Sequence, residues 1–513
     1  MDEHRILNVY FILYPNIYIF TTLNCSNIII LANQNFLRNL KHIRVIDKIK
    51  FGTDGWRAII ADTYTIKNVA RIAEGTALWL KKQKENPVLI IGYDCRFNGV
   101  MFMETAIRVY LHHGIKVYYA KNFVSTPMVS LGAKNYKADI GVVLTASHNP
   151  PSYGGYKLKS EHGGPLDPAL VQEVEDMIPE YANEAYLSID LQEARSNGKL
   201  VEVDLEEDYL KAVQKEFDIE AIKNSPLRLA YDAMYGAGQN AVKRLFPDID
   251  LLHCEYNPSF MGQAPEPIAK NLIELSNFIK KEGNIDVALA TDGDADRIGL
   301  FGKDGEFVDS HHIMLLLIHY LVKYKGMKGK VVTAFSSTPK IGKMCAHYGL
   351  DYEVVKIGFK YIAGIMVEED VLLGGEESGG IAIKGHIPER DGIWMGLVIW
   401  EFMAKSGKSL QSLIDEVYEI VGEFKFERSD LHITDDLKAQ IIENCKNNVY
   451  SSFGEYKVER VETLDGYKFY LPNECWVMIR PSGTEPVLRV YAEAKDLTEV
   501  RKILQATENT IKQ

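Results

Sequence analysis

Short apolar runs rich in β-branched residues recur along the chain and alternate with stretches of helical periodicity. In the first half, such runs occupy residues 87–93, 116–120 and 140–144, and helix-like segments occupy 64–82 and 99–113. The same alternation returns further along the chain. Strands that alternate with helices of about 10–15 residues are typical of βαβ units with a mostly parallel sheet. The pattern therefore predicts an α/β protein.

Chain length and a change in this pattern predict several domains. A chain of 513 residues is too long for one hydrophobic core, and domains of about 100–150 residues would number three or four. The last stretch has its own order of elements, with strands predicted at 425–433, near 457–470 and at 475–480, and helices at 434–448 and 497–512. We predict an N-terminal extension at 1–45 and domains at 46–203, 204–308, 309–422 and 423–513.

The N-terminal extension has an unusual composition. It carries no charged residue from Ile6 to Leu37, but polar residues such as Asn8, Asn16 and Thr21 interrupt the run of about 20 apolar residues that a membrane span needs. A basic start and a cleavage site, which a secretory signal would have, are not evident. We interpret the segment as an extension outside the core fold, with a membrane anchor or an integral part of the fold as alternatives.

Charge and cysteine usage exclude some classes of partner. The net charge is −12, and acidic and basic residues are mixed along the chain, which disfavours nucleic acid as a partner but leaves small anionic substrates open. The six cysteines are scattered and form no CxxC pair, so we expect a reducing, cytoplasmic compartment and no structural zinc. No stable membrane association is expected.

A serine loop (145–150) follows the buried run at 140–144. Ser147 is therefore predicted at the carboxyl edge of the sheet, where ligands bind in open α/β folds; the alternative is a plain Ser/Asn-rich turn. The glycine pair after the loop predicts a sharp return that brings Lys157 back over the serine. Near a phosphate, this lysine would be an anchor or, with a lowered pKa, a general base. Arg57, on a glycine-punctuated loop after a short strand, supplies a cation or a surface ion pair.

An aspartate loop (292–297) follows the apolar strand at 285–290. Asp292, Asp294 and Asp296 stand at alternate positions, and three clustered carboxylates repel one another unless a cation is present. Oxygen ligands suit Mg²⁺. The spacing resembles the start of an EF-hand, but the glycine and glutamate of that motif do not follow. We predict a magnesium site.

Two further glycine-containing loops follow predicted strands. A sugar loop (374–380) presents Glu376 and Ser378, whose carboxylate and hydroxyl suit sugar hydroxyl groups, although a plain loop is the alternative. A phosphate loop (480–486) combines a guanidinium, two hydroxyls and backbone N–H groups freed by glycine, which is typical of an anion-binding turn.

These four loops, in this order, resemble those of the α-D-phosphohexomutase superfamily, the phosphoglucomutase/phosphomannomutase family. The resemblance covers about residues 46–510. It implies a heart-shaped arrangement of four domains: three similar α/β domains with mixed sheets and a C-terminal α+β domain like the TATA-box-binding protein. It further implies an intramolecular phosphotransferase that interconverts glucose 1-phosphate and glucose 6-phosphate through a phosphoserine and a bisphosphorylated sugar.

The resemblance also assigns roles to individual residues. The catalytic group would comprise Ser147, His148, Lys157, Arg57 and Arg297, with Lys157 or His148 as the base. The Mg²⁺ ligands would be Asp292, Asp294, Asp296 and the phosphate on Ser147. Substrate would be held by Lys360, Glu376, Ser378 and Arg390. The non-reacting phosphate would be bound by Arg480, Ser482, Gly483, Thr484 and Arg489. Glucose 1,6-bisphosphate would be activator and intermediate, a hinge near 420–425 would close the cleft, and the enzyme would be a monomer or homodimer.

The preferred sugar is predicted from the same loops. The stretch from Gly375 to Ser378, followed by Arg390-Asp391-Gly392, resembles phosphoglucomutases, although these have lysine in place of the arginine. Gly380 stands where dual-specificity enzymes often have histidine, and Glu377 where phosphoglucosamine mutases usually have glutamine. Glucose is therefore expected, with mannose or both sugars as the alternative. A metal-dependent sugar-phosphate phosphatase and a silent sugar-phosphate-binding protein are the rival classes.

Overall fold

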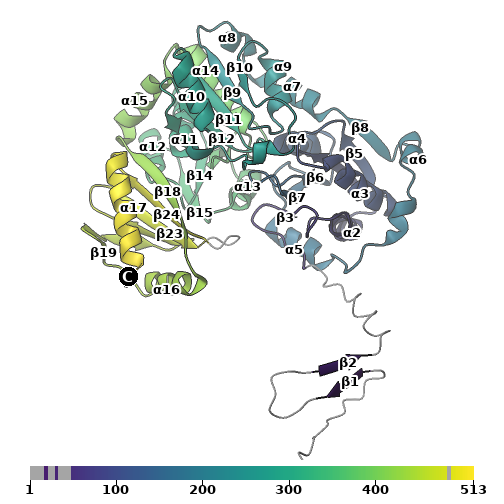
Figure 1. Cartoon of the computed structure of the whole chain (residues 1–513). Helices are drawn as coiled ribbons and strands as arrows, with labels where there is room; N and C mark the ends of the chain where they lie inside the picture. The colour runs from purple at the N-terminus through teal and green to yellow at the C-terminus, as the bar shows by residue number, and fades with distance from the viewer. Residues whose placement is uncertain (1–16, 21–28, 33–47, 482–486, 513) are drawn as a thin grey trace, which may run out of the picture. The chain divides into compact units, whose positions relative to one another are not determined.

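Four β-sheets, each formed by a consecutive stretch of the chain, organise the larger part of the protein (Figure 1). The computed structural model describes residues 17–20, 29–32, 48–481 and 487–512. Residues Ile49–Gln513 form one compact unit, and Met1–Lys48 form another.

Of the predicted N-terminal extension, the structure describes two short strands. β1 (Ile17–Phe20) pairs antiparallel with β2 (Ile29–Ala32). The other residues predicted to form the extension lie outside the described residues. Among the helices that the structure describes, none has the length and apolar character needed to cross a membrane.

The first sheet is mixed and has six strands in the order β3-β7-β6-β4-β5-β8. They are β3 (Trp56–Ile59), β4 (Val88–Tyr93), β5 (Lys116–Ala120), β6 (Ile140–Leu144), β7 (Tyr153–Ser160) and β8 (Leu200–Val203). Four neighbouring strands, β6, β4, β5 and β8, run parallel. β7 pairs antiparallel with both β6 and β3. The helices are α2 (Ile66–Gln83), α3 (Gly99–His112), α4 (Thr126–Asn135), α5 (Pro168–Asp176), η1 (Glu184–Ser188) and α6 (Leu191–Ser196).

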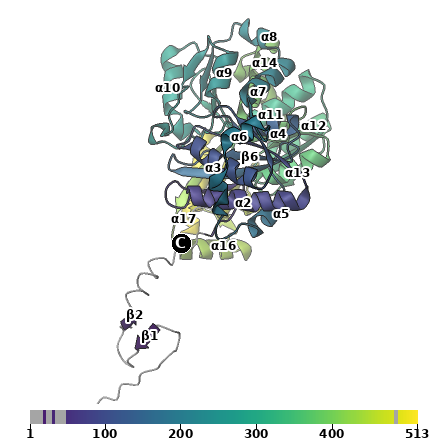
Figure 2. The ribbon, with the colours of Figure 1, turned by 90° about the vertical axis from the view of Figure 1, so that its right-hand side faces the viewer.

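Alternation of side chains along β4 explains how helices cover both faces of this sheet. Leu89 and Ile91 pack in the cluster that includes α2 and α3, whereas Ile90 packs in the cluster that includes α4. α2 and α3 pack against each other (Figure 2). With both faces covered, the loops at the carboxyl ends of the parallel strands are the part of the sheet available for a site.

Two local predictions for this region are wrong. The short strand predicted before the first glycine loop lies after it, as β3, so Arg57 stands on a strand. The glycine pair that was predicted to form a sharp turn, Gly154 and Gly155, instead lies at the beginning of strand β7. A Cβ atom at Gly154 would lie 2.4 Å from the ring of Tyr64, and one at Gly155 would lie 2.2 Å from the carbonyl oxygen of Thr145. Close packing therefore requires these glycines.

The second sheet has the order β10-β9-β11-β12-β13. Its strands are β9 (Leu229–Asp232), β10 (Asp250–Leu252), β11 (Val287–Thr291), β12 (Ile298–Gly302) and β13 (Phe307–Val308). β12 returns antiparallel to β11, while β9 and β10 are parallel to it. The helical segments are α7 (Leu205–Glu216), α8 (Ile219–Lys223), α9 (Gln239–Leu245), η2 (Phe260–Gly262), η3 (Ala269–Asn271) and α10 (Ile273–Glu282).

The third sheet has the order β15-β14-β16-β17 and shares a core with the second. Its strands are β14 (Lys330–Ala334), β15 (Tyr352–Val355), β16 (Val371–Gly375) and β17 (Ile381–Ile383), of which only β17 is antiparallel to its neighbour. The helices are α11 (Ser310–His319), the π-helical turn η4 (Tyr320–Tyr324), α12 (Lys340–Tyr348), α13 (Phe359–Glu368), α14 (Gly392–Ser406) and α15 (Leu410–Val421). α11 is buried over its whole length, which fits the continuous apolar run at 313–318.

The fourth sheet is antiparallel and has the order β18-β24-β23-β22-β21. Its strands are β18 (Lys425–His432), β21 (Arg460–Glu462), β22 (Tyr467–Tyr470), β23 (Trp476–Pro481) and β24 (Val487–Ala494). A hairpin of β19 (Ser452–Phe453) and β20 (Tyr456–Lys457) and the helices α16 (Asp435–Lys446) and α17 (Leu497–Ile511) complete it. The predicted fold class, three α/β domains with mixed sheets and one α+β domain, is confirmed.

Candidate active site

The serine loop and the aspartate loop meet at the ends of β6 and β11. The hydroxyl of Ser147 donates a hydrogen bond of 2.7 Å to Oδ2 of Asp292, although 145 residues separate the two in the sequence. Ser147 is only 1% exposed, and its φ of 50° lies in the left-handed region, which is unusual for a residue with a side chain. The structure therefore brings together the two loops that the sequence singled out.

The three aspartates form a buried cluster that fits a divalent cation. All three are fully buried, and one carboxylate oxygen from each lies within 4.8 Å of the others. Oδ1 of Asp292 accepts two backbone N–H groups, whereas Oδ1 of Asp294 and Oδ1 of Asp296 have no hydrogen-bond partner among the described residues. Burial and the two neighbouring carboxylates raise the pKa of Asp292 well above its ordinary value. Partnerless buried oxygens and mutual repulsion are what a bound Mg²⁺ would relieve.

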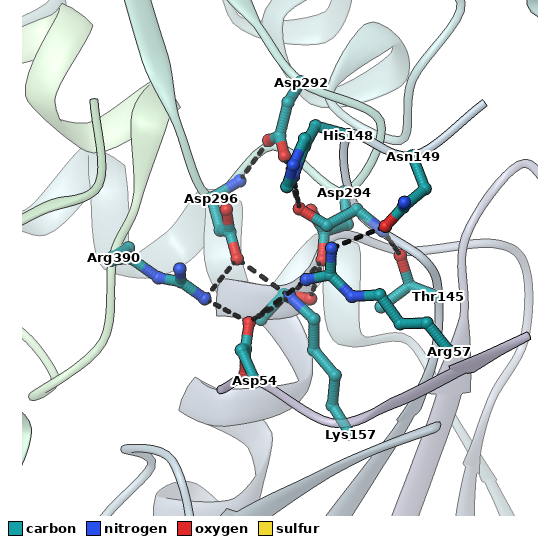
Figure 3. Close-up of polar contacts among 12 residues, drawn as sticks. Asp54, Arg57, Thr145, His148, Asn149, Lys157, Asp292, Asp294, Asp296 and Arg390 are labelled. Carbon is teal, nitrogen blue, oxygen red and sulfur yellow. Dashed lines mark hydrogen bonds and ion pairs between the residues drawn. The ribbon is translucent and has the colours of Figure 1, made fainter. Parts of the chain in front are cut away.

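Lys157 reaches this cluster from β7 (Figure 3). Its Nζ lies 2.7 Å from Asp54, 2.8 Å from Asp294 and 2.9 Å from Asp296. Burial opposes the charge on Lys157, but the three carboxylates outweigh it and raise the pKa of the ammonium group. Of the two roles considered for Lys157, these contacts favour the anchor over the general base.

His148 has the opposite environment. Burial and the nearby guanidinium groups of Arg297 and Arg57 lower its pKa well below the ordinary value, so the imidazole is neutral at physiological pH. Its Nδ1 lies 3.4 Å from the hydroxyl oxygen of Ser147. A neutral imidazole therefore lies beside the serine hydroxyl, whose hydrogen bond goes to Asp292. The two arginines are themselves held, Arg57 by Asn149 at 2.6 Å and Arg297 by Glu266 at 3.5 Å.

Arg390, which was predicted to hold substrate, contacts carboxylates in this structure. It donates to Asp54 at 2.5 Å and to Asp296 at 2.7 Å (Figure 3). Its guanidinium also lies over the ring of Phe359. Arg390 thus links the third domain to carboxylates of the first two. Lys360, also predicted to hold substrate, lies on α13.

The sugar loop lies between β16 and β17. Oε1 of Glu376 accepts the backbone N–H of Gly358 at 2.9 Å, and burial raises the pKa of the Glu376 carboxyl. Ser378 is partly buried in the same loop. The carboxylate of Glu377 lies 3.6 Å from Arg428 of β18, so a side chain of the fourth domain contacts the sugar loop directly.

The fourth domain supplies a group of arginines beside this loop. Arg480 and Arg489 are paired directly across β23 and β24, and each contacts an aspartate, Asp465 at 3.2 Å and Asp430 at 3.8 Å respectively. Arg428 belongs to the same group, because its guanidinium donates to the carboxylate of Asp430 at 3.1 Å. Ser482, Gly483 and Thr484, the other residues predicted for the phosphate loop, lie outside the described residues.

Among the residues of this site that the sequence reasoning missed are Asp54, Asp94 and Arg428. The carboxylate of Asp94 accepts the hydroxyl of Thr145 at 2.6 Å, and Asp54 joins Lys157 to Arg390. The position of Asp94 directly after β4, at the same sheet edge as the serine loop, is a sequence signal that could have found it.

The chain belongs to the phosphoglucomutase/phosphomannomutase family. It matches the family's alpha/beta/alpha domain I at residues 48–185, domain II at 207–305, domain III at 309–421 and the C-terminal domain at 434–510. The protein is therefore a phosphohexomutase, an intramolecular phosphotransferase.

Individual relatives carry names that differ in the sugar. The chain is 30% identical over 462 residues to a phosphoglucomutase/phosphomannomutase of Thermococcus kodakarensis, covering 89% of this chain and 96% of the relative. It is also 30% identical over 467 residues to a phosphoglucosamine mutase of Methanocaldococcus jannaschii, with coverage of 89% and 96%. A solved structure from Thermus thermophilus, provisionally assigned as a phosphomannomutase, aligns with a TM-score of 0.81 at 30% identity, covering 91% of this chain and 100% of the other.

The serine loop and the aspartate loop approach so closely that one methyl group added at Gly293 should lower the activity strongly. A Cβ atom at Gly293 would lie 2.6 Å from the carbonyl oxygen of Ser147, which is a backbone atom and moves only if the serine loop moves. We expect Gly293→Ala to lower kcat about 10- to 100-fold through this displacement, measured with purified enzyme. Gly364→Ala is the matched control, because nothing lies within 4 Å of a Cβ atom there. Full activity of the Gly293 variant would contradict the close approach of the loops.

Proposed function

We propose that this phosphohexomutase interconverts glucose 1-phosphate and glucose 6-phosphate, with Ser147 as the residue that is phosphorylated. The observation that carries the proposal is the 2.7 Å contact between the Ser147 hydroxyl and Asp292 within the buried aspartate cluster. A nucleophile beside a cation site is the arrangement that phosphoryl transfer requires, because the reaction depends mainly on positioning and charge stabilisation.

The proposed cycle begins with phosphorylated Ser147. A hydroxyl of the sugar monophosphate attacks the phosphorus, the bond from phosphorus to Oγ breaks, the hydroxyl proton passes through a base to Oγ, and glucose 1,6-bisphosphate forms. The intermediate turns round, Oγ attacks the other phosphorus, and the bond from that phosphorus to the sugar oxygen breaks. The Oγ proton passes through the base to the released sugar oxygen, and the neutral His148 is best placed to be that base. Lys157, Arg57 and Arg297 would hold the phosphoryl oxygens.

Magnesium belongs to this proposal through the aspartate cluster. Asp292, Asp294 and Asp296 would hold Mg²⁺, and the partnerless oxygens of the last two support that assignment. When bound, the ion supplies positive charge that stabilises the negative charge of the transferring phosphoryl group.

Substrate binding would involve the third and fourth domains. Glu376 and Ser378 would bind sugar hydroxyl groups, and Arg480, Arg489 and the phosphate loop would bind the non-reacting phosphate. We add Arg428 to the residues that would bind this phosphate. It contacts Glu377, and it shares the carboxylate of Asp430 with Arg489. Gly422, whose φ is 82°, supports the hinge proposed near 420–425.

The choice of glucose rests on the sugar loop and on Glu377. The relatives' names include glucose, mannose and glucosamine, so phosphomannomutase or dual activity is the second candidate. We expect kcat/KM for glucose 1-phosphate to exceed that for mannose 1-phosphate and glucosamine 1-phosphate about tenfold or more. The test measures isomerisation of the three substrates side by side with a trace of the matching bisphosphate. A faster rate with either rival would reverse the assignment, and stoichiometric release of free phosphate would replace mutase with phosphatase activity.

A further inference from the structure

One arginine binds four backbone carbonyl groups in and just after the serine loop. NH1 of Arg96 donates to the carbonyl oxygens of Pro150 at 2.8 Å and Tyr153 at 3.0 Å, and NH2 donates to those of Ser147 at 2.6 Å and Asn149 at 2.7 Å. Arg96 is 4% exposed, so water does not compete for these bonds. The planar fork of a guanidinium is the side chain that can bind four carbonyls at fixed angles, which the ammonium group of lysine cannot do.

Arg96 is itself fixed from two sides. Its Nε lies 3.3 Å from Oδ2 of Asp94, and its guanidinium lies 5.1 Å from the ring centre of Phe260 in the second domain. The same Asp94 carboxylate accepts the hydroxyl of Thr145 at 2.6 Å, and the hydroxyl oxygen of Thr145 accepts the backbone N–H of Ser147 at 2.8 Å. The N–H and C=O groups of the serine are therefore both held by one network.

This network acts on a residue whose conformation is unfavourable by itself. The left-handed φ of Ser147 is disfavoured for a residue with a Cβ atom and persists only when its surroundings impose it. We propose that Arg96 is a positioning residue for the reaction: with Asp94 and Thr145, it imposes the conformation that aims Oγ at Asp292 and at the phosphoryl group. The inference rests on the proposed role of Ser147 as the phosphorylated residue.

The first test compares Arg96→Ala and Arg96→Lys with wild type. We expect the alanine variant to lose about 100-fold in kcat and in the single-turnover rate of Ser147 phosphorylation by glucose 1,6-bisphosphate, with little change in KM. Free guanidinium, below denaturing concentration, should restore part of the rate, whereas ammonium should not. Arg71→Ala is the matched control: this buried arginine also binds a backbone carbonyl, that of Pro179 at 2.8 Å, and its loss should leave kcat unchanged.

A second pair keeps the test decisive if Arg96→Ala does not fold. Thr145→Val removes the hydroxyl that bridges Asp94 and Ser147 and should lower kcat at least about tenfold, whereas Thr145→Ser retains the hydroxyl and most of the rate. Wild-type phosphorylation rates in folded Arg96→Lys and Thr145→Val would overturn the positioning role. If wild-type enzyme carries the phosphate on another residue, the proposed function fails instead, so peptide mapping of the phosphoenzyme separates the two failures.

Discussion

Replacing Ser147 by alanine is expected to lower kcat by at least about 10⁴-fold. Without its hydroxyl no group would carry the phosphate, and the covalent intermediate that divides the reaction into two steps could not form. The hydroxyl is the atom that contacts Asp292, and the network around the loop holds the backbone rather than the side chain. The fold should therefore survive the change. The measurement is the coupled conversion of glucose 1-phosphate to glucose 6-phosphate, together with the thermal midpoint of unfolding.

Ser152→Ala provides the matched control for this variant. Ser152 is exposed and lies five residues further along the chain, so its hydroxyl is not in the buried cluster. Incubation with glucose 1,6-bisphosphate should add one phosphate to wild type and to the control, and none to Ser147→Ala, by intact-mass spectrometry. Substantial turnover by Ser147→Ala would assign the nucleophile to another residue.

Asp292→Asn is expected to reduce kcat about 100- to 1,000-fold and to weaken the response to Mg²⁺, because one of three anionic ligands is lost. The same change should not destabilise the metal-free protein. Burial and two like charges raise the pKa of Asp292 in the folded state above that in the unfolded chain, so its ionisation costs stability at neutral pH, and a neutral amide avoids that cost. The thermal midpoint in EDTA should equal or exceed that of wild type.

The metal should reverse this order of stability. A ligand that binds only the folded state stabilises it by about 2.7 kcal/mol at a hundredfold excess over Kd, so Mg²⁺ should raise the midpoint of wild type but hardly that of Asp292→Asn. Asp304→Asn, at an exposed turn of the same domain, is the control and should behave as wild type. If Mg²⁺ does not change the thermal midpoint of the wild-type protein, the result would argue against a metal site in the aspartate loop.

The loops of the site could be predicted because each follows an apolar strand in the sequence. Parallel strands place their carboxyl ends at one edge of a sheet, so Ser147 after β6 and Asp292 after β11 could both be assigned to sheet edges. That the two edges face each other across a domain boundary could not be derived from strand patterns; only the resemblance implied it. The 2.7 Å contact is information that the fold adds.

Residues that act through tertiary contacts were beyond the sequence. The sequence could not assign roles to Arg96 and Arg428, since each gains its role from the backbone or carboxylates of another element. The glycine pair of β7 suits either a turn or a strand that other atoms approach closely. The sequence alone favours the turn, because the atoms that approach the pair, the ring of Tyr64 and the carbonyl of Thr145, are distant in sequence. Arg390 likewise could not be assigned without knowing that Asp54 lies opposite it.

The strand order of the fourth sheet has a consequence for biosynthesis. β24 lies between β18 and β23, although it is made after both of them. During translation, the edges of its two neighbours therefore remain without a partner until residue 494 has been added, and unpaired strand edges favour association between chains. A premature stop codon shortly before β24 would leave both edges open permanently, so such a truncated product should aggregate and be degraded even though the Ser147 and Asp292 loops are already encoded.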